Sequence, residues 1–240
     1  MALAHSTTTD MTEVPSGLLF VPLGATEQHG PHLPLSTDTI IAESWAGATA
    51  KVLADQHDIT VSVAPALPYG SSGEHQAFPG TLSIGHEALH QVLVELVRSA
   101  AIHHRGVVFF CGHGGNAATT LAVVQQLNHE RHNVIALHPQ WDPKEFGSID
   151  AHAGRAETSL MLHLSPGLVR REAAEPGNTA PLRALIDRLQ QGGVAEVSAN
   201  GVLGDPTEAT ADEGRRMFAA LVAQSADSVM SFVRSAKPHG

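Results

Sequence analysis

The sequence contains a single cysteine, Cys111, and no apolar run that approaches the length of a membrane span. A lone thiol excludes an intrachain disulfide and gives no zinc-finger spacing. The N-terminal segment MALAHSTTTDMTEVPSG lacks the basic stretch followed by an apolar stretch that marks a secretory signal. We therefore expect a cytoplasmic protein, because a reducing compartment suits this cysteine usage.

Basic residues are also scarce, with 14 Lys and Arg against 24 Asp and Glu and a net charge of −10. Nucleic acids and anionic membranes both require a basic surface, so the charge predicts neither as a partner. With 240 residues, of which 42% are hydrophobic, the chain can bury the core of one large domain.

Short continuous apolar runs alternate with segments of helical periodicity. The runs are bounded by Gly, Pro or polar residues, which is typical of parallel strands covered on both faces; they span 17–24, 59–67, 106–112 and 133–139. Apolar residues recur at helical spacing over 41–52, 89–100, 121–127 and 218–232. This alternation predicts a single doubly wound α/β domain over residues 17–235, with a mostly parallel sheet flanked by helices. Residues 1–16 and the terminal KPHG are predicted to be flexible tails.

Histidine is abundant, at 16 residues, and several histidines fall in polar motifs that follow predicted strands. GATEQHG follows the first strand, PYGSSGEHQ the second and GHGGN the third, while DAHAGRAETS precedes a helical run. Ligands of open α/β sheets bind beyond the carboxyl ends of the strands. We therefore expect these motifs to meet at one site.

Five residues in these motifs are candidate metal ligands: Glu27, His29, Asp38, His113 and Glu157. One divalent ion rarely needs three protein carboxylates and two histidines. Two ions that share one carboxylate do need a ligand set of this size. Two divalent cations carry four positive charges against three carboxylates, so a bridging hydroxide balances the cluster. We hypothesise a dinuclear hydrolase with Asp38 between the ions, Glu27 and His113 on one, and His29 and Glu157 on the other.

Several of these residues have a structural alternative. Glu27 and His29 could form the hydrogen-bonding pair of a turn, and Asp38 could cap a helix. His32 is expected to be a structural hydrogen-bond donor. His75 and Glu74 lie in a long Gly-rich loop, 70–81, where they could be solvated or contact a substrate.

The segment GVVFFCGHGGNA also matches a dinucleotide-binding fingerprint, with a strand before Gly112-x-Gly114-x-x-Ala117. That fingerprint requires an acidic residue about 20 positions later, at the end of the next strand. The next predicted strand ends in His138 and Pro139 instead. The glycines are better explained as room around His113.

The motifs LGATEQHGPHLPLSTD, CGHGGN, FPGT and HAGRAETS resemble the creatininase family of metal-dependent amidohydrolases, over nearly the whole chain. YGSSGEHQAFPGTLSIG and GVLGDPTEATADEGRRMFAALV are similar to a subgroup, the creatininase-like peptidases of mycofactocin biosynthesis. The resemblance implies two divalent metal ions per chain, held by the five residues named above, and a catalytic His152. Histidine with carboxylate suits Zn²⁺, Fe²⁺ or Mn²⁺.

The subgroup resemblance implies release of a modified C-terminal Val-Tyr dipeptide from a small precursor peptide, with His152 moving a proton to the leaving amine. Creatininase itself has a glutamate ligand where this chain has Gly115, so Glu157 must replace that ligand, and the departure argues against creatinine hydrolysis. Hydrolysis of another small cyclic amide or formamide is the alternative. A non-catalytic scaffold is a third possibility. His75, Gly114 and Gly115 are candidate substrate-binding residues, and the family resemblance suggests a homo-oligomer.

Overall fold

A computed structural model of the chain describes residues 1–13 and 16–236. Its centre is a sheet of four parallel strands in the order β2-β1-β3-β4. The strands are β1 (Leu18–Leu23), β2 (Val61–Val63), β3 (Gly106–Cys111) and β4 (Val134–Leu137). Each lies within a predicted apolar run, so the predicted α/β fold is confirmed, with every strand pair parallel.

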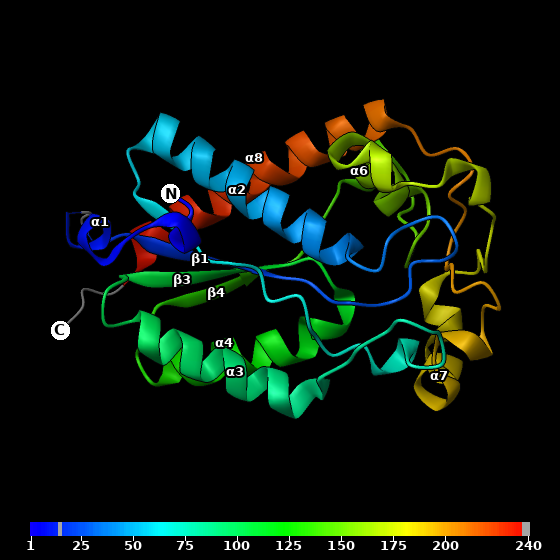
Figure 1. Ribbon diagram of the computed structural model, residues 1–240, viewed down its shortest axis with the longest axis horizontal. Coiled ribbons are helices and arrows are strands. Elements are labelled where there is room, and N and C mark those ends of the chain that lie inside the picture. Colours follow the sequence, from blue (N-terminus) through cyan, green and yellow to red (C-terminus); the bar gives the residue numbers. More distant parts are fainter. Residues whose placement is uncertain (14–15, 237–240) are drawn as a thin grey trace.

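Helices cover both faces of the sheet, as Figure 1 shows. α2 (Thr37–His57) and α8 (Ala211–Ser235) cover one face, and α3 (Gly85–Ala100) and α4 (Ala117–His129) cover the other. All four were predicted, although each begins before its first predicted apolar residue. The remaining helices of the described chain are α1 (Thr8–Glu13), α5 (Pro143–Phe146), α6 (Arg155–Leu164) and α7 (Leu182–Gly192).

Alternate residues of each strand enter different apolar layers, because successive side chains of a strand point to opposite faces. Leu18 and Phe20 of β1 pack with α2 and α8, while Leu19 and Val21 pack with α3 and α4. All four side chains are buried. The sheet is therefore apolar on both sides, which explains why its strands lack polar alternation in the sequence.

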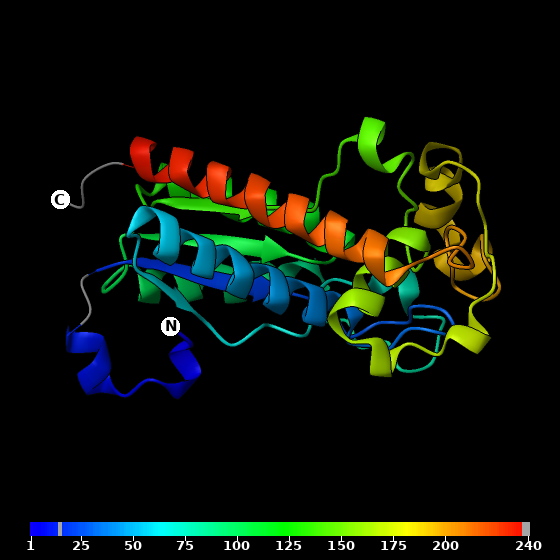
Figure 2. The ribbon, with the colours of Figure 1, turned by 90° about the horizontal axis from the view of Figure 1, so that it is seen from above.

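The polar end of the molecule lies beyond the carboxyl ends of the strands. Figure 2 shows α6 and α7 at the end toward which the strands point, with the N-terminus and the last turn of α8 at the opposite end. The helix α7 and the short α5 were not predicted. Nor does Asp38 cap α2: the N-cap is Ser36, and Asp38 lies in the first turn. Its carboxylate is thereby left for other partners.

Part of the segment 1–16, for which a flexible tail is predicted, forms regular structure. Leu3–His5 forms a 3₁₀ helix, followed by α1. The Met1 amino group donates a hydrogen bond to the Val61 carbonyl at 2.9 Å, and Ala2 forms a parallel bridge with Val63. The edge strand β2 leaves backbone groups unpaired, and the N-terminus takes them. The predicted KPHG tail lies outside the described residues.

None of the described helices is both long enough and apolar enough to cross a bilayer.

Two helical glycines should respond oppositely to alanine. Gly214 in α8 is buried, and a Cβ there would collide with the Ser159 carbonyl of α6, whereas Gly47 in α2 is exposed with open space around it. Gly47→Ala should stabilise the fold by about 0.5–1 kcal/mol through helix propensity. Gly214→Ala should destabilise it by about 2 kcal/mol or more, because the added methyl group would force the backbones of α6 and α8 apart. Urea unfolding of both variants checks this; equal effects would mean that the α6–α8 crossing is not close.

Candidate metal centre

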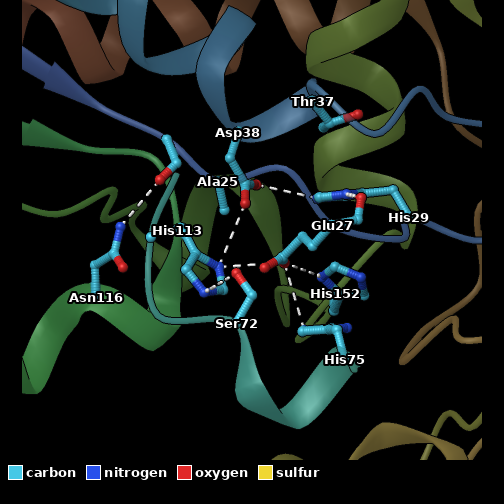
Figure 3. Close-up of polar contacts among 12 residues, drawn as sticks. Ala25, Glu27, His29, Thr37, Asp38, Ser72, His75, His113, Asn116 and His152 are labelled. Atoms are coloured by element: carbon cyan, nitrogen blue, oxygen red, sulfur yellow. Dashed lines mark hydrogen bonds and ion pairs between the residues drawn. The ribbon is translucent and has the colours of Figure 1, made fainter. Parts of the chain in front are cut away.

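Side chains from four segments meet at the carboxyl end of the sheet, as Figure 3 shows for most of them. Glu27 and His29 come from the loop after β1, and Asp38 comes from the first turn of α2. His113 follows β3, and Glu157 lies in the first turn of α6. The first four are buried, with at most 5% of each residue exposed. All five predicted ligand residues therefore converge.

Asp38 is the residue that the two halves of this cluster share. Its Oδ1 lies 3.0 Å from His29 Nε2, and its Oδ2 lies 3.3 Å from His113 Nδ1. Glu27 joins Asp38 and His113 in a group whose ligand atoms lie within 4.8 Å of one another, and Glu157 joins Asp38 and His29 in a second such group. Each group could hold one cation, with Asp38 facing both.

Backbone carbonyls fix the orientation of both imidazoles. His29 Nδ1 lies 3.1 Å from the Glu27 carbonyl oxygen, and His113 Nε2 lies 2.9 Å from that of Ser71. A carbonyl only accepts hydrogen bonds, so these ring nitrogens carry protons and donate. The opposite nitrogens, Nε2 of His29 and Nδ1 of His113, are those that face the carboxylates. This is how ligating histidines are commonly held.

Glu27 lacks hydrogen bonds although it is fully buried. Ring nitrogens of His113, His75 and His152 surround its Oε1 at 3.2, 3.4 and 3.8 Å. Yet neither Glu27 oxygen makes a hydrogen bond of acceptable geometry within the described chain, and neither does Asp38 Oδ2. Burying unpaired carboxylate oxygens is costly. Oxygen and imidazole donors aimed at a common point fit a divalent cation.

The cluster attracts positive charge. Burial alone would lower the pKa of His29, but the carboxylates of Asp38, Glu157 and Glu27 together outweigh it and raise that pKa to about 10. Burial likewise opposes the shift at His113, whose pKa Asp38 and Glu27 hold well above its usual value. Burial would raise the pKa of Asp38, yet His29 and His113 together hold it well below its usual range. The carboxylates thus draw protons onto the histidines in the absence of another cation.

Glu157 is held by the turn that precedes its helix. The Ala153 N–H donates a hydrogen bond to Oε2 at 2.6 Å, and the same oxygen lies 3.9 Å from His29 Nε2. Ala153 has a φ of 50°, a left-handed conformation that is uncommon outside glycine. Burial raises the pKa of Glu157 to about 7, although the charge on His29 opposes this.

The sequence analysis missed Gln28, which connects two further histidines. Its side-chain Nε2 lies 2.8 Å from His75 Nδ1 and 3.0 Å from the Gly201 carbonyl, while Oε1 accepts from the Gly30 N–H at 2.9 Å. Gln28 Nε2 also lies 3.1 Å from His152 Nε2, but that nitrogen carries a proton for the Gln28 carbonyl oxygen, so the two amide N–H groups go to His75 and Gly201. His75 must accept at Nδ1, so its proton lies on Nε2, facing Glu27.

His152 is oriented by the backbone carbonyl of Gln28. Its Nε2 lies 2.8 Å from the Gln28 carbonyl oxygen, so Nε2 donates and Nδ1 faces Glu27. Burial, followed by the positive charge on His29, holds the pKa of His152 well below its usual value. The same causes, with His113 added, lower the pKa of His75 to about 3. Both rings are neutral at pH 7.

The remaining singled-out residues lie around this cluster. His32 is buried, and its Nε2 lies 2.9 Å from Thr158 Oγ1, as expected for a structural residue. A Cβ on Gly115 would collide with His113, Glu74 and Ser71, whereas Gly114 has open space. Room around His113 is therefore provided by Gly115 and not by Gly114. His75, Gly114 and Gly115 all line the cavity above the cluster, so substrate contact stays a prediction for them.

A family profile, creatininase (creatinine amidohydrolase), matches residues 4–229. The chain belongs to the creatininase family.

Named relatives cover most of the chain. A mycofactocin precursor peptide peptidase from Mycobacterium tuberculosis is 50% identical over 90% of this chain and 86% of its own length. One from Mycolicibacterium smegmatis is 48% identical, over 88% of this chain and 84% of its own length.

Solved creatininase structures share the fold. A manganese form aligns with a TM-score of 0.77 at 23% identity, covering 95% of this chain and 97% of that one. A form described as Zn-Zn aligns with a TM-score of 0.74 at 23% identity, covering 95% and 96%. At this identity the likeness concerns the fold alone.

Replacing Gln28 should alter the tautomers of the site. In Gln28→Glu the side chain has no N–H to donate, so His75 Nδ1 should take a proton and the neutral Nε2–H tautomer should be lost. Assigned ¹⁵N imidazole spectra of the metal-free protein would report this directly. The matched control is Gln76→Glu, at an exposed position one residue from His75. An unchanged His75 signal in Gln28→Glu would contradict the assigned hydrogen bond.

Proposed function

We propose that this chain is a metal-dependent peptidase that releases the modified C-terminal Val-Tyr dipeptide from the precursor peptide in mycofactocin biosynthesis. The observation that carries the proposal is the pair of relatives about 50% identical and so named, together with the buried cluster around Asp38. A cavity of about 1230 Å³ opens above that cluster, lined by Asp38, His113 and Glu157. This volume exceeds what a small cyclic amide needs and suits a peptide segment.

We further propose two divalent ions per chain, Zn²⁺, Fe²⁺ or Mn²⁺, with Asp38 facing both. Glu27 and His113 would hold one ion, and His29 and Glu157 the other. This division is supported by the separate directions of the two Asp38 oxygens, each within 3.3 Å of a different imidazole. The unpaired oxygens of Glu27 and Asp38 supply a further reason for cations there.

When bound, such ions supply Lewis acidity toward the scissile carbonyl and lower the pKa of a water molecule. The protein contributes a proton carrier at His152. Its Nε2 proton is held by the Gln28 carbonyl, so the proton that moves is carried at Nδ1, which faces the cluster. A neutral imidazole at this position can accept a proton from the attacking water and pass it to the leaving amine.

Hydrolysis of a small cyclic amide is the second candidate, since the matching family profile is described as creatinine amidohydrolase. The deciding experiment incubates metal-loaded protein with modified precursor, unmodified precursor and creatinine, and weighs the products by mass spectrometry. We expect a dipeptide-sized fragment from the modified precursor alone. Creatine as the product would support the second candidate instead. If no substrate is cleaved, either before or after chelator treatment, the protein would be a non-catalytic scaffold.

His152→Ala should separate chemistry from metal binding. Removing the proton carrier should reduce turnover about 10²- to 10⁴-fold, with the metal content near two ions per chain. Elemental analysis with single-turnover assays measures both quantities. A fully active variant would remove His152 from the mechanism.

Asp38→Asn should reduce metal binding itself. The amide keeps the size of Asp38 but removes its negative charge and one oxygen donor, so neither group can bind its ion tightly. We expect metal content below one ion per chain after dialysis, with thermal unfolding still cooperative. Retention of two ions would show that Asp38 is not shared between them.

A further inference from the structure

The helix α7 carries an apolar stripe that is only partly used in packing. Leu182, Leu185, Ile186 and Leu189 recur at helical spacing along one side. Leu185 is 5% exposed and packs with Val194 and Leu203. By contrast, Leu182 is 48% exposed and Ile186 is 42% exposed. Half of the stripe therefore anchors the helix, and the other half is largely exposed.

The unused half of the stripe faces the cavity of the metal centre. Leu182 and Ile186 line the same cavity of about 1230 Å³ as His113, His152 and Glu157. Figure 1 shows α7 away from the helices that cover the sheet, and Figure 2 places it at the end beyond the strands. The two side chains thus form an apolar wall within the cavity whose polar part is the candidate metal centre.

The helix that carries this wall is connected by backbone contacts to the segments that carry His152 and His75. Leu203, which packs against Leu185, also forms an antiparallel bridge with His152, in which the Leu203 N–H donates to the His152 carbonyl at 2.9 Å. Next to α7, Gly193 lies close against the Glu74 backbone with a φ of 68°. The α7 region therefore packs against Leu203, which bridges to His152, and against the 3₁₀ turn that carries His75.

The chemistry of the cavity suits an uncharged apolar group at this wall. Among the described residues that line it, none is Lys or Arg, whereas Asp38, Glu74 and Glu157 are acidic. A free carboxylate against the wall would thus find no Lys or Arg side chain to pair with. Exposed leucine and isoleucine gain free energy when an aliphatic or aromatic group covers them.

We propose that Leu182 and Ile186 form the subsite for the apolar side chains of the Val-Tyr-derived dipeptide, so that α7 sets the specificity of the enzyme. This inference rests on the function proposed above and adds the residues that recognise the released end. It makes α7 a recognition element that takes no part in the chemistry itself.

The test compares Leu182→Gln and Ile186→Gln with Leu121→Gln, a control at a 59% exposed leucine of α4 outside the cavity. Glutamine has a helix propensity close to that of leucine and above that of isoleucine, but it disfavours apolar contact. With metal-loaded protein and the modified precursor, each α7 variant should raise KM about tenfold, with kcat changed less and the metal content unchanged. Inhibition by the released dipeptide should weaken in parallel, and the control should match the wild type.

Three outcomes would overturn the inference in distinguishable ways. Wild-type cleavage with unchanged KM in both α7 variants would leave the proposed function standing and place the subsite elsewhere. A smaller assembly by light scattering, accompanying any loss of activity, would mean that a second copy of the chain covers this face. Absence of precursor cleavage by the wild type would remove the proposed function, and the subsite with it.

Discussion

The candidate site depends on one carboxylate, Asp38, whose two oxygens face two different imidazoles. Asp38 can face both imidazoles because the first turn of α2 packs against the ends of both β1 and β3. A Cβ on Gly24 at the end of β1 would collide with Thr39, and a Cβ on Gly112 at the end of β3 would collide with the Asp38 backbone. Two glycines at adjacent strand ends thus let a helix begin against the sheet, and the helix carries the shared carboxylate to the centre of the cluster.

Much of this arrangement could be predicted from residue types and their order. Parallel strands buried on both faces appear as continuous apolar runs, and β1 and β3 were located to within a residue or two for that reason. Because the carboxyl ends of parallel strands share one edge, motifs far apart in sequence were expected to meet there. The convergence of Glu27, Asp38, His113 and Glu157 follows from topology as much as from chemistry.

Other features could not be inferred in the same way. In an extended chain Gln28 would point away from Glu27 and His29, but the loop is irregular and the Gln28 side chain turns toward His75. Asp38 was a reasonable helix cap until the structure placed the cap at Ser36. The helix α7 had an apolar pattern at helical spacing, yet its stripe is short and half exposed, and only the cavity gives that exposure a meaning.

The orientation of the histidines shows why composition alone does not define a site. His29, His113 and His152 are each fixed by a backbone carbonyl, from Glu27, Ser71 and Gln28 respectively. Any residue offers such a carbonyl, so no sequence motif records it. The path of the loops therefore decides which nitrogen of each ring faces the carboxylates, while the side chains decide only that nitrogen and oxygen donors are present. A loop change that moved one of these carbonyls would disturb the site while leaving every motif intact.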